Sequence, residues 1–145
     1  MPLNPSQKTS LEVVMRQLET ALLRVRQFVQ NPPENSLLTH YRPVSEGTRP
    51  GLEMMIDQML AEIAILVHEY DLQPREEDLG RYIDAEMGVA WADLYDTLSP
   101  KLRRFGDVDP ALETTLDPHI RRLIKLAHTL GLSARVGDSP RSTTS

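Results

Sequence analysis

The amino-acid sequence predicts an all-α fold, a helical bundle, and three observations point to it. Two helix-length runs carry an apolar residue every three or four positions, which places those residues on one helix face. No segment alternates apolar and polar residues with the period of two of a half-buried strand, and no Asn-Gly or Asp-Gly hairpin turn occurs. We expect four main helices at about residues 10–30, 50–72, 75–98 and 118–130, with short helical turns at 100–105 and 110–116.

The first apolar run predicts an amphipathic helix. Its stripe consists of Leu11, Val14, Leu18, Ala21, Val25 and Phe28. Thr9 and Glu12 have the spacing of a capping box, so we expect the helix to begin at these residues. The pair Pro32 and Pro33 ends it, because proline cannot continue the backbone hydrogen-bond ladder.

Residues 31–50 form a long connection, since loops beyond about 12–15 residues are uncommon in compact domains. The segment contains Leu37, Leu38, Tyr41 and Val44, which makes it too apolar for a simple linker. We expect it to cross one end of the bundle and anchor there. A lid or docking loop, a disordered segment and an element swapped between protomers are the alternatives.

The second apolar run predicts a central helix that begins near Pro50, because proline is favoured at the first helical position. Its stripe consists of Leu52, Ile56, Met59, Ile63, Leu66 and Tyr70. Met55, Leu60 and Val67 extend the apolar surface over more than half of the circumference. Such a helix normally contacts neighbours on two sides.

Glycines and prolines mark the remaining elements. Gly88 is expected to bend or split the third helix, and Gly131 to end the fourth in a left-handed C-cap. Good N-cap residues precede a proline at Ser99-Pro100, Asp109-Pro110 and Asp117-Pro118, and each pair predicts a helix start. We expect one domain at residues 9–132, after an N-terminal arm at 1–8 and before a disordered tail at 133–145.

Charge is distributed unevenly along this chain of net charge −5. Residues 71–100 carry two basic and eight acidic side chains, whereas residues 101–145 carry eight basic and five acidic ones. These two segments are expected to attract each other, within one chain or between protomers. The basic segment lacks the interleaved aromatic residues that stack on bases, so no nucleic-acid partner is expected.

The composition argues against several kinds of chemistry. The absence of cysteine rules out a disulfide, a thiolate zinc site and a cysteine nucleophile. No histidine has the Glu-x-x-His spacing of di-iron bundles, and no phosphate-binding loop or nucleophile elbow occurs. The longest apolar run is far shorter than a membrane span. We therefore expect no metal, no cofactor, no membrane contact and a cytoplasmic location.

The best catalytic candidates are Arg122 and His128 on the last predicted helix. Their spacing resembles the Arg-x4-6-His motif of HEPN-type ribonucleases, which are small helical bundles and often dimers. The resemblance implies that His128 acts as acid and base and that Arg122 stabilises phosphate charge. This chain departs from the family at Leu123, where a polar residue is usual. A surface arginine, with a histidine that favours the helix C-terminus, accounts for the same residues.

The excess of apolar helical surface favours a non-catalytic protein that works by binding itself, as a homodimer, or another protein. The residues expected at the interface are Met55, Met59, Leu60, Val67, Leu37, Leu38 and Tyr41. The alternatives are the ribonuclease just described and a regulatory bundle that binds a small molecule. The latter predicts a closed apolar cavity beneath Leu37, Leu38 and Tyr41.

Overall fold

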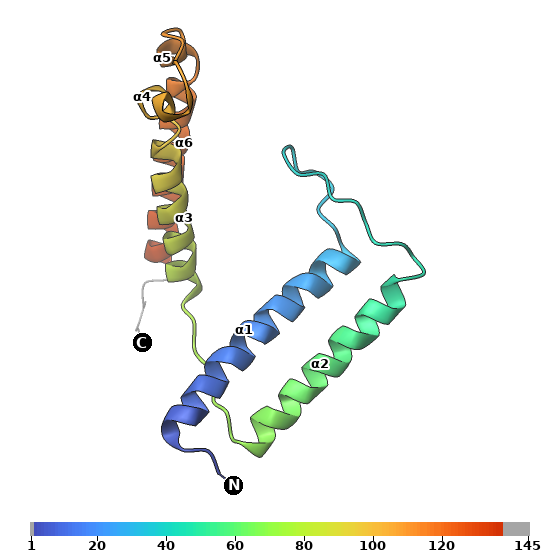
Figure 1. The fold of residues 1–145 in the computed structure, drawn as a ribbon. Coiled ribbons are helices and arrows are strands. Elements are labelled where there is room, and N and C mark those ends of the chain that lie inside the picture. The colour runs from blue at the N-terminus through green and yellow to red at the C-terminus, as the bar shows by residue number, and fades with distance from the viewer. Residues whose placement is uncertain (1, 138–145) are drawn as a thin grey trace. The chain divides into compact units, whose positions relative to one another are not determined.

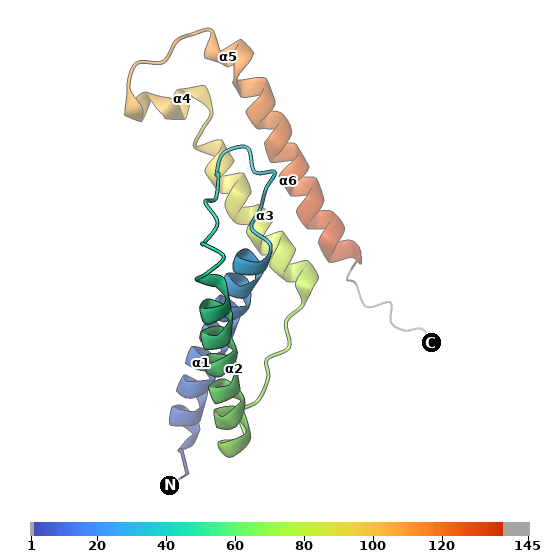
Figure 2. The same cartoon turned by 90° about the vertical axis from the view of Figure 1, so that its right-hand side faces the viewer.

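The computed structural model of the chain describes residues 2–137 and consists of helices and connecting segments, with no strand in that range. The all-α prediction is therefore confirmed. A single bundle of four main helices is not confirmed, because the helices divide into two compact units, residues 1–75 and 76–145. The helices of both units are labelled in Figure 1, and Figure 2 shows them after a quarter turn.

The N-terminal unit is a pair of antiparallel helices (Figure 1). Helix α1 covers Pro5–Gln30 and helix α2 covers Arg49–Glu69. The loop between them has no regular secondary structure over residues 31–45, before a turn at residues 46–48 leads into α2. The core of the pair is small: Leu22, Ile56 and Ile63 are buried, and Met15, Leu18 and Leu60 pack against them.

Helix α1 begins earlier than the sequence indicates, so the predicted start near Thr9 and Glu12 is wrong. Asn4 is the N-cap, and its Oδ1 accepts a hydrogen bond from the Gln7 backbone N–H at 2.8 Å. In return, Oε1 of Gln7 accepts from the Asn4 backbone N–H at 3.0 Å. This capping box satisfies two N–H groups that a helix start leaves free, so Pro5 can occupy the first helical position.

We expect the substitution Asn4→Ala to lower the free energy of unfolding of the N-terminal unit by about 1 kcal/mol, because it removes this cap. Urea denaturation followed by far-UV circular dichroism measures the change. Thr9→Ala is the matched control, since Thr9 is an exposed residue inside the helix. An equal loss in both variants would contradict the assignment of Asn4 as the cap.

The face of α1 that packs on α2 is rotated from the predicted stripe. Leu22 is buried in the contact with Met15 and Leu18 beside it, whereas Val14 and Val25 are about half exposed. The apolar surface of α1 is broader than one helix contact, and a single partner helix covers only a strip of it. The periodicity could not show which part of that surface would be covered.

Helix α2 is apolar nearly all round, as the sequence predicts. Ile56 and Ile63 are buried, while Met54, Met55 and Ile65 are more than half exposed. Within the N-terminal unit α2 packs against α1 alone. The expected neighbour on a second side is therefore not provided by this unit.

The chain leaves α2 through a left-handed residue, Asp71, which has φ 51°. The next N–H, of Leu72, donates to the carbonyl of Val67 at 3.0 Å, and the Leu72 side chain is buried. This arrangement is typical of a Schellman C-cap with its apolar contact. The Gln73 N–H then donates to Oε2 of Glu12 at 2.7 Å, which ties this end of the hairpin to α1.

In the C-terminal unit, helix α3 (Leu79–Tyr95) packs antiparallel against helix α6 (Asp117–Gly137). Between them the chain forms the short helices α4 (Ser99–Leu102), η1 (Arg103–Phe105) and α5 (Leu112–Thr115), in the two segments predicted as helical turns. The acidic and basic segments meet here in part. Nη1 of Arg135 lies 3.3 Å from Oδ2 of Asp84, and Nη2 of Arg104 lies 3.9 Å from Oδ2 of Asp96.

Gly88 does not split the third helix, and the helix end predicted at Gly131 is wrong. Helix α3 continues through Gly88, and α6 continues through Gly131 to Gly137, past the end predicted at residue 130. Gly131 lies where the two helices approach closely: a Cβ added there would be 2.6 Å from Oδ1 of Asp84. The absence of a side chain at Gly131 therefore lets α3 and α6 pack closely, and the residue does not form the predicted C-cap. The part of the predicted tail from residue 138 onwards lies outside the described residues.

Candidate functional site

The structure does not bring all the interface residues predicted from sequence into one patch. Met55 and Met59 lie on one edge of α2 and are 54% and 43% exposed. Val67 lies on the opposite edge, beside Leu60, which is half-buried against the core. Leu37, in the loop and apart from these residues, is almost fully exposed, as are its neighbour Leu38 and, less strongly, Tyr41.

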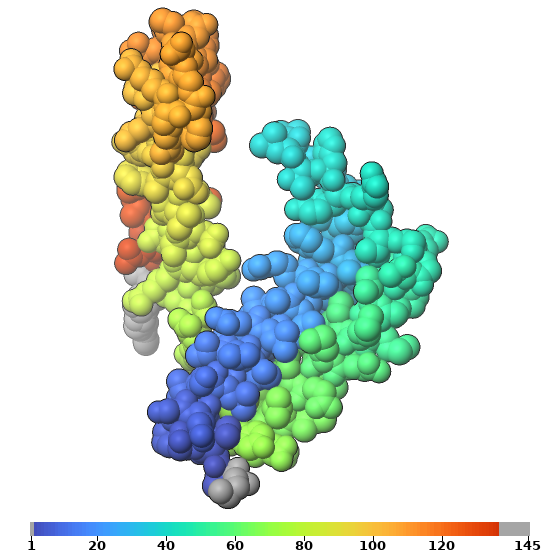
Figure 3. Space-filling view, viewed as in Figure 1, coloured from blue at the N-terminus to red at the C-terminus, as the bar shows by residue number. Residues whose placement is uncertain are grey.

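One edge of the hairpin carries a set of exposed apolar side chains, which we call the N-terminal flank. Its members are Val14, Ala21 and Val25 of α1 and Met55 and Met59 of α2. Helical spacing places each set on the side of the α1–α2 contact that faces away from Glu19, Leu23 and Val67. All five side chains are exposed, and the exposed Glu62, three positions after Met59, is the charged residue on the α2 edge of this surface. The space-filling view shows α1 in blue and α2 in green, in contact along their length (Figure 3).

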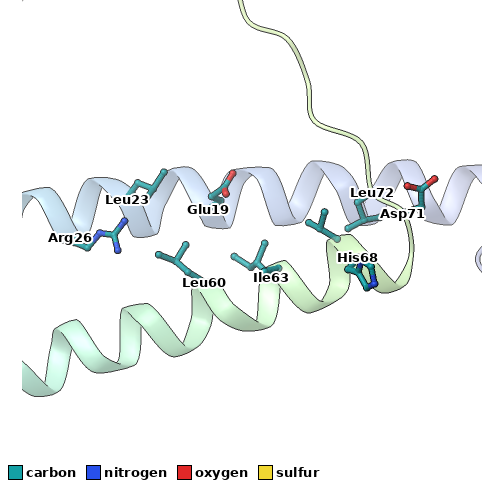
Figure 4. A pocket seen from close by; sticks show the side chains of 10 residues that line it. Glu19, Leu23, Arg26, Leu60, Ile63, His68, Asp71 and Leu72 are labelled. Atoms are coloured by element: carbon teal, nitrogen blue, oxygen red, sulfur yellow. The ribbon is translucent and has the colours of Figure 1, made fainter.

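The other edge of the hairpin is an open groove of about 650 Å³ between α1 and α2 (Figure 4). Apolar side chains, among them Leu60 and Ile63, form its floor. Its polar members do not converge: in Figure 4 the carboxylate of Glu19 and the ring of His68 point away from each other. Arg26 is paired with Asp57, Nη1 to Oδ1, at 3.3 Å. This groove therefore offers no acid–base pair aimed at a shared ligand position.

A second concave surface lies between the end of α1 and the loop. We call it the loop groove; its volume is about 340 Å³ and it is lined by Arg24, Val25, Phe28, Val29, Pro32, Pro33, Tyr41, Arg42, Pro43 and Val44. The rings of Phe28 and Tyr41 pack edge to face, with their centroids 5.5 Å apart. The expected closed cavity is not found here. The groove is open beside Tyr41, and Leu37 and Leu38 point into solvent.

In the C-terminal unit, the most buried ionisable group is Asp117, which is only 1% exposed. Its Oδ1 accepts from the Ser99 backbone N–H at 2.8 Å, and its Oδ2 accepts from the Ser99 hydroxyl at 2.7 Å. The hydroxyl bond, with the backbone bond and the charge of Arg121, lowers the pKa of Asp117 from its ordinary value of 3.8, and burial opposes this only in part. Asp117 thus fastens the start of α4 to the start of α6, which is a structural role.

The proposed catalytic pair is placed on α6 and does not converge within one chain. Arg122 and His128 are both exposed and stand six positions apart, which in an α-helix means about 9 Å of rise and about 120° of rotation. Neither side chain forms a hydrogen bond or ion pair with another residue between 2 and 137. The ribonuclease reading stays a prediction, without support from the geometry of one chain.

No family model, curated protein or solved structure matches this chain. Among residues 2–137, no group of three or more His, Asp or Glu side chains could hold a metal ion. No helix in the described part of the chain has the length and apolarity needed to cross a membrane.

Sequence reasoning missed several residues that the structure makes prominent. Val14 and Val25 were expected to face a helix of the same bundle and are instead exposed on the N-terminal flank. Nothing in the sequence marks Arg24 and Arg42 as binding residues, because only the path of the loop brings them to one groove. Asp117 was recognised as a helix-start residue, but its tie to Ser99 spans 18 positions and could not be read from local spacing.

Proposed function

We propose that this chain is a non-catalytic, cytoplasmic helical protein that acts through protein–protein contacts, and that its first partner is a second copy of itself. The observation that carries the proposal is the N-terminal flank. Met55 is 54% exposed and Val14 is 51% exposed, although each is next in sequence to a residue of the small core, Ile56 or Met15. Burying such a side chain fully contributes about 1.5–3 kcal/mol, so this surface favours association.

The composition of the flank fits the centre of an interface. Charged residues are depleted at interface cores, and methionine is enriched there. The flank runs about 17 Å along α1, from Val14 to Val25, and about 6 Å along α2, from Met55 to Met59. Two hairpins that present the same apolar edge can pair about a two-fold axis into a four-helix bundle, which is a common solution for helical dimers.

Self-association is preferred over a different partner because one hairpin cannot bury its own apolar surface. Among residues 2–137 only six apolar side chains are buried, and two of them, Leu98 and Ala127, belong to the C-terminal unit. A second copy supplies a surface of the same shape and chemistry in every cell that makes the chain. Exposed apolar patches of this kind mark interaction sites in soluble proteins.

The double substitution Val14→Glu and Met59→Glu tests the proposal. We expect the unaltered chain to sediment as a dimer at micromolar concentration and the variant to raise the dimer dissociation constant by about a hundredfold or more, since it places unpaired charges in the interface. Sedimentation equilibrium over a range of concentrations measures the constant.

The matched control is Val13→Glu with Gln58→Glu. These exposed residues are neighbours in sequence of the flank residues but lie on other faces of α1 and α2, and they add the same charge. The control should remain dimeric. A strict monomer at high micromolar concentration, or equal weakening by the two double substitutions, would contradict self-association through this flank.

A further inference from the structure

The loop groove combines an apolar lining with an excess of positive charge. Its apolar side chains include Val25 and Phe28 from α1 and Tyr41 and Pro43 from the loop. The charged residues that line the groove are Arg24 and Arg42, and no acidic side chain lines it. Small-molecule sites are typically mostly apolar, with a few polar groups that fix the orientation of the ligand.

The two arginines are free to bind a ligand. Arg24 and Arg42 are exposed, and neither forms an ion pair or hydrogen bond with another residue in the range 2–137. Nearby arginines are engaged, by contrast: Arg26 pairs with Asp57, and Arg49 donates to the Gln30 carbonyl at 3.2 Å. The fork of a guanidinium matches the two oxygens of a carboxylate.

The walls of the groove are formed before any ligand arrives. Arg49 ties the start of α2 to the end of α1, which fixes the two ends of the loop relative to each other. The Thr39 N–H donates to the Ser36 hydroxyl at 3.2 Å, and the hydroxyls of Ser45 and Thr48 are 2.7 Å apart. Pro43 holds the backbone of the residue before it in an extended conformation. A preformed site loses less conformational entropy on binding.

We propose that the loop groove binds a small amphipathic carboxylate, whose apolar body packs on Phe28 and Tyr41 and whose head group is held by Arg24 and Arg42. A volume of about 340 Å³ suits a short aliphatic or aryl acid. The groove runs along the last two turns of α1, where the partial negative charge of the helix end repels a dianionic phosphate ester more strongly than a monoanion. The groove shares Val25 with the N-terminal flank, whereas Arg24, Arg42, Phe28 and Tyr41 are not members of the flank.

The test uses octanoate as the probe, titrated into the full ¹⁵N-labelled chain and followed by the amide chemical shifts. We expect shifts at residues 24–44 and tighter binding with each added methylene, by up to about fourfold per group. Octyltrimethylammonium has an alkyl tail one carbon longer and the opposite charge, and it should still bind at least about tenfold more weakly. Octyl phosphate should bind no more tightly than octanoate.

The double substitution Arg24→Ala and Arg42→Ala should weaken octanoate binding by about tenfold or more. Lys101→Ala with Arg103→Ala removes the same charge from exposed residues of the C-terminal unit and should leave binding unchanged. Tyr41→Ala should weaken every tail length, while Tyr41→Phe retains the ring and should bind as before. Equal binding of the two head groups, tighter binding of octyl phosphate, shifts centred outside residues 24–44, or equal effects of the two charge variants would each overturn the assignment.

Discussion

Replacing Gly131 by leucine is expected to lower the free energy of unfolding of the C-terminal unit by about 3 kcal/mol. Gly131 sits in the contact between α3 and α6, where an added Cβ would meet Oδ1 of Asp84 at 2.6 Å and Cβ of Met87 at 3.5 Å. A leucine side chain extends well beyond its Cβ, so the two helices would have to separate. The separation would also break the 3.3 Å ion pair of Asp84 with Arg135.

The measurement is urea denaturation followed by tryptophan fluorescence. Trp91, the one tryptophan of the chain, lies in α3 with its ring centroid 4.9 Å from that of Tyr95, so its emission reports on this unit. Gly88→Leu is the matched control: nothing lies within 4 Å of a Cβ there, and replacing a helical glycine should raise stability by about 0.5–1 kcal/mol. Equal effects of the two leucines would show that Gly131 is not a packing residue.

The substitution Asp117→Ala is expected to cost about 3 kcal/mol in the same unit. It leaves the N–H and the hydroxyl of Ser99 buried without the carboxylate that now accepts from both, at 2.8 and 2.7 Å. Asp117→Asn retains one acceptor oxygen and should cost less. Asp107→Ala is the control, because Asp107 is exposed and forms no ion pair or side-chain hydrogen bond within residues 2–137. A cost for Asp117→Ala no larger than for the control would refute the tie between α4 and α6.

The same carboxylate makes stability depend on pH. Because the pKa of Asp117 is lower in the folded chain than its ordinary value of 3.8, the unfolded chain binds the proton more readily. The stabilisation is therefore fully present above about pH 4 and is lost as the pH falls through the folded-state pKa. The difference in unfolding free energy between the chain and Asp117→Asn should shrink as the pH drops below 4. A difference that stays constant would contradict the lowered pKa.

Local sequence signals predicted the helices well and their ends less well. The helical period located α1, α2, α3 and α6, and proline located the start of α2. The predicted helix ends were wrong where two local signals competed. Asn4 and Gln7 form the capping box that Thr9 and Glu12 also match by spacing, and Glu12 is used instead to accept from Gln73. The partner of Glu12 is 61 positions away, so local spacing could not indicate it.

The apolar character of the surfaces could be predicted from the sequence, but not which residues would form them. The sequence indicated more apolar helical surface than a small core can bury, and the exposed Met55 and Met59 agree with that expectation. It could not indicate that Val14 and Val25 would be exposed, because a broad stripe fits several rotations of one helix against another. The groove formed by Phe28 and Tyr41 depends on the path of the loop, for which the sequence offers only proline positions.

By itself, then, the sequence determined the class of this protein and the identity of its helices, because apolar periodicity and caps act over a few residues. Only the tertiary structure decided which face of α1 is covered and why Gly131 is small. It also decided that the carboxylate of Asp117 accepts hydrogen bonds from Ser99. These depend on contacts between residues far apart in the chain, where the distance between two helices, and not local preference, determines which side chain fits.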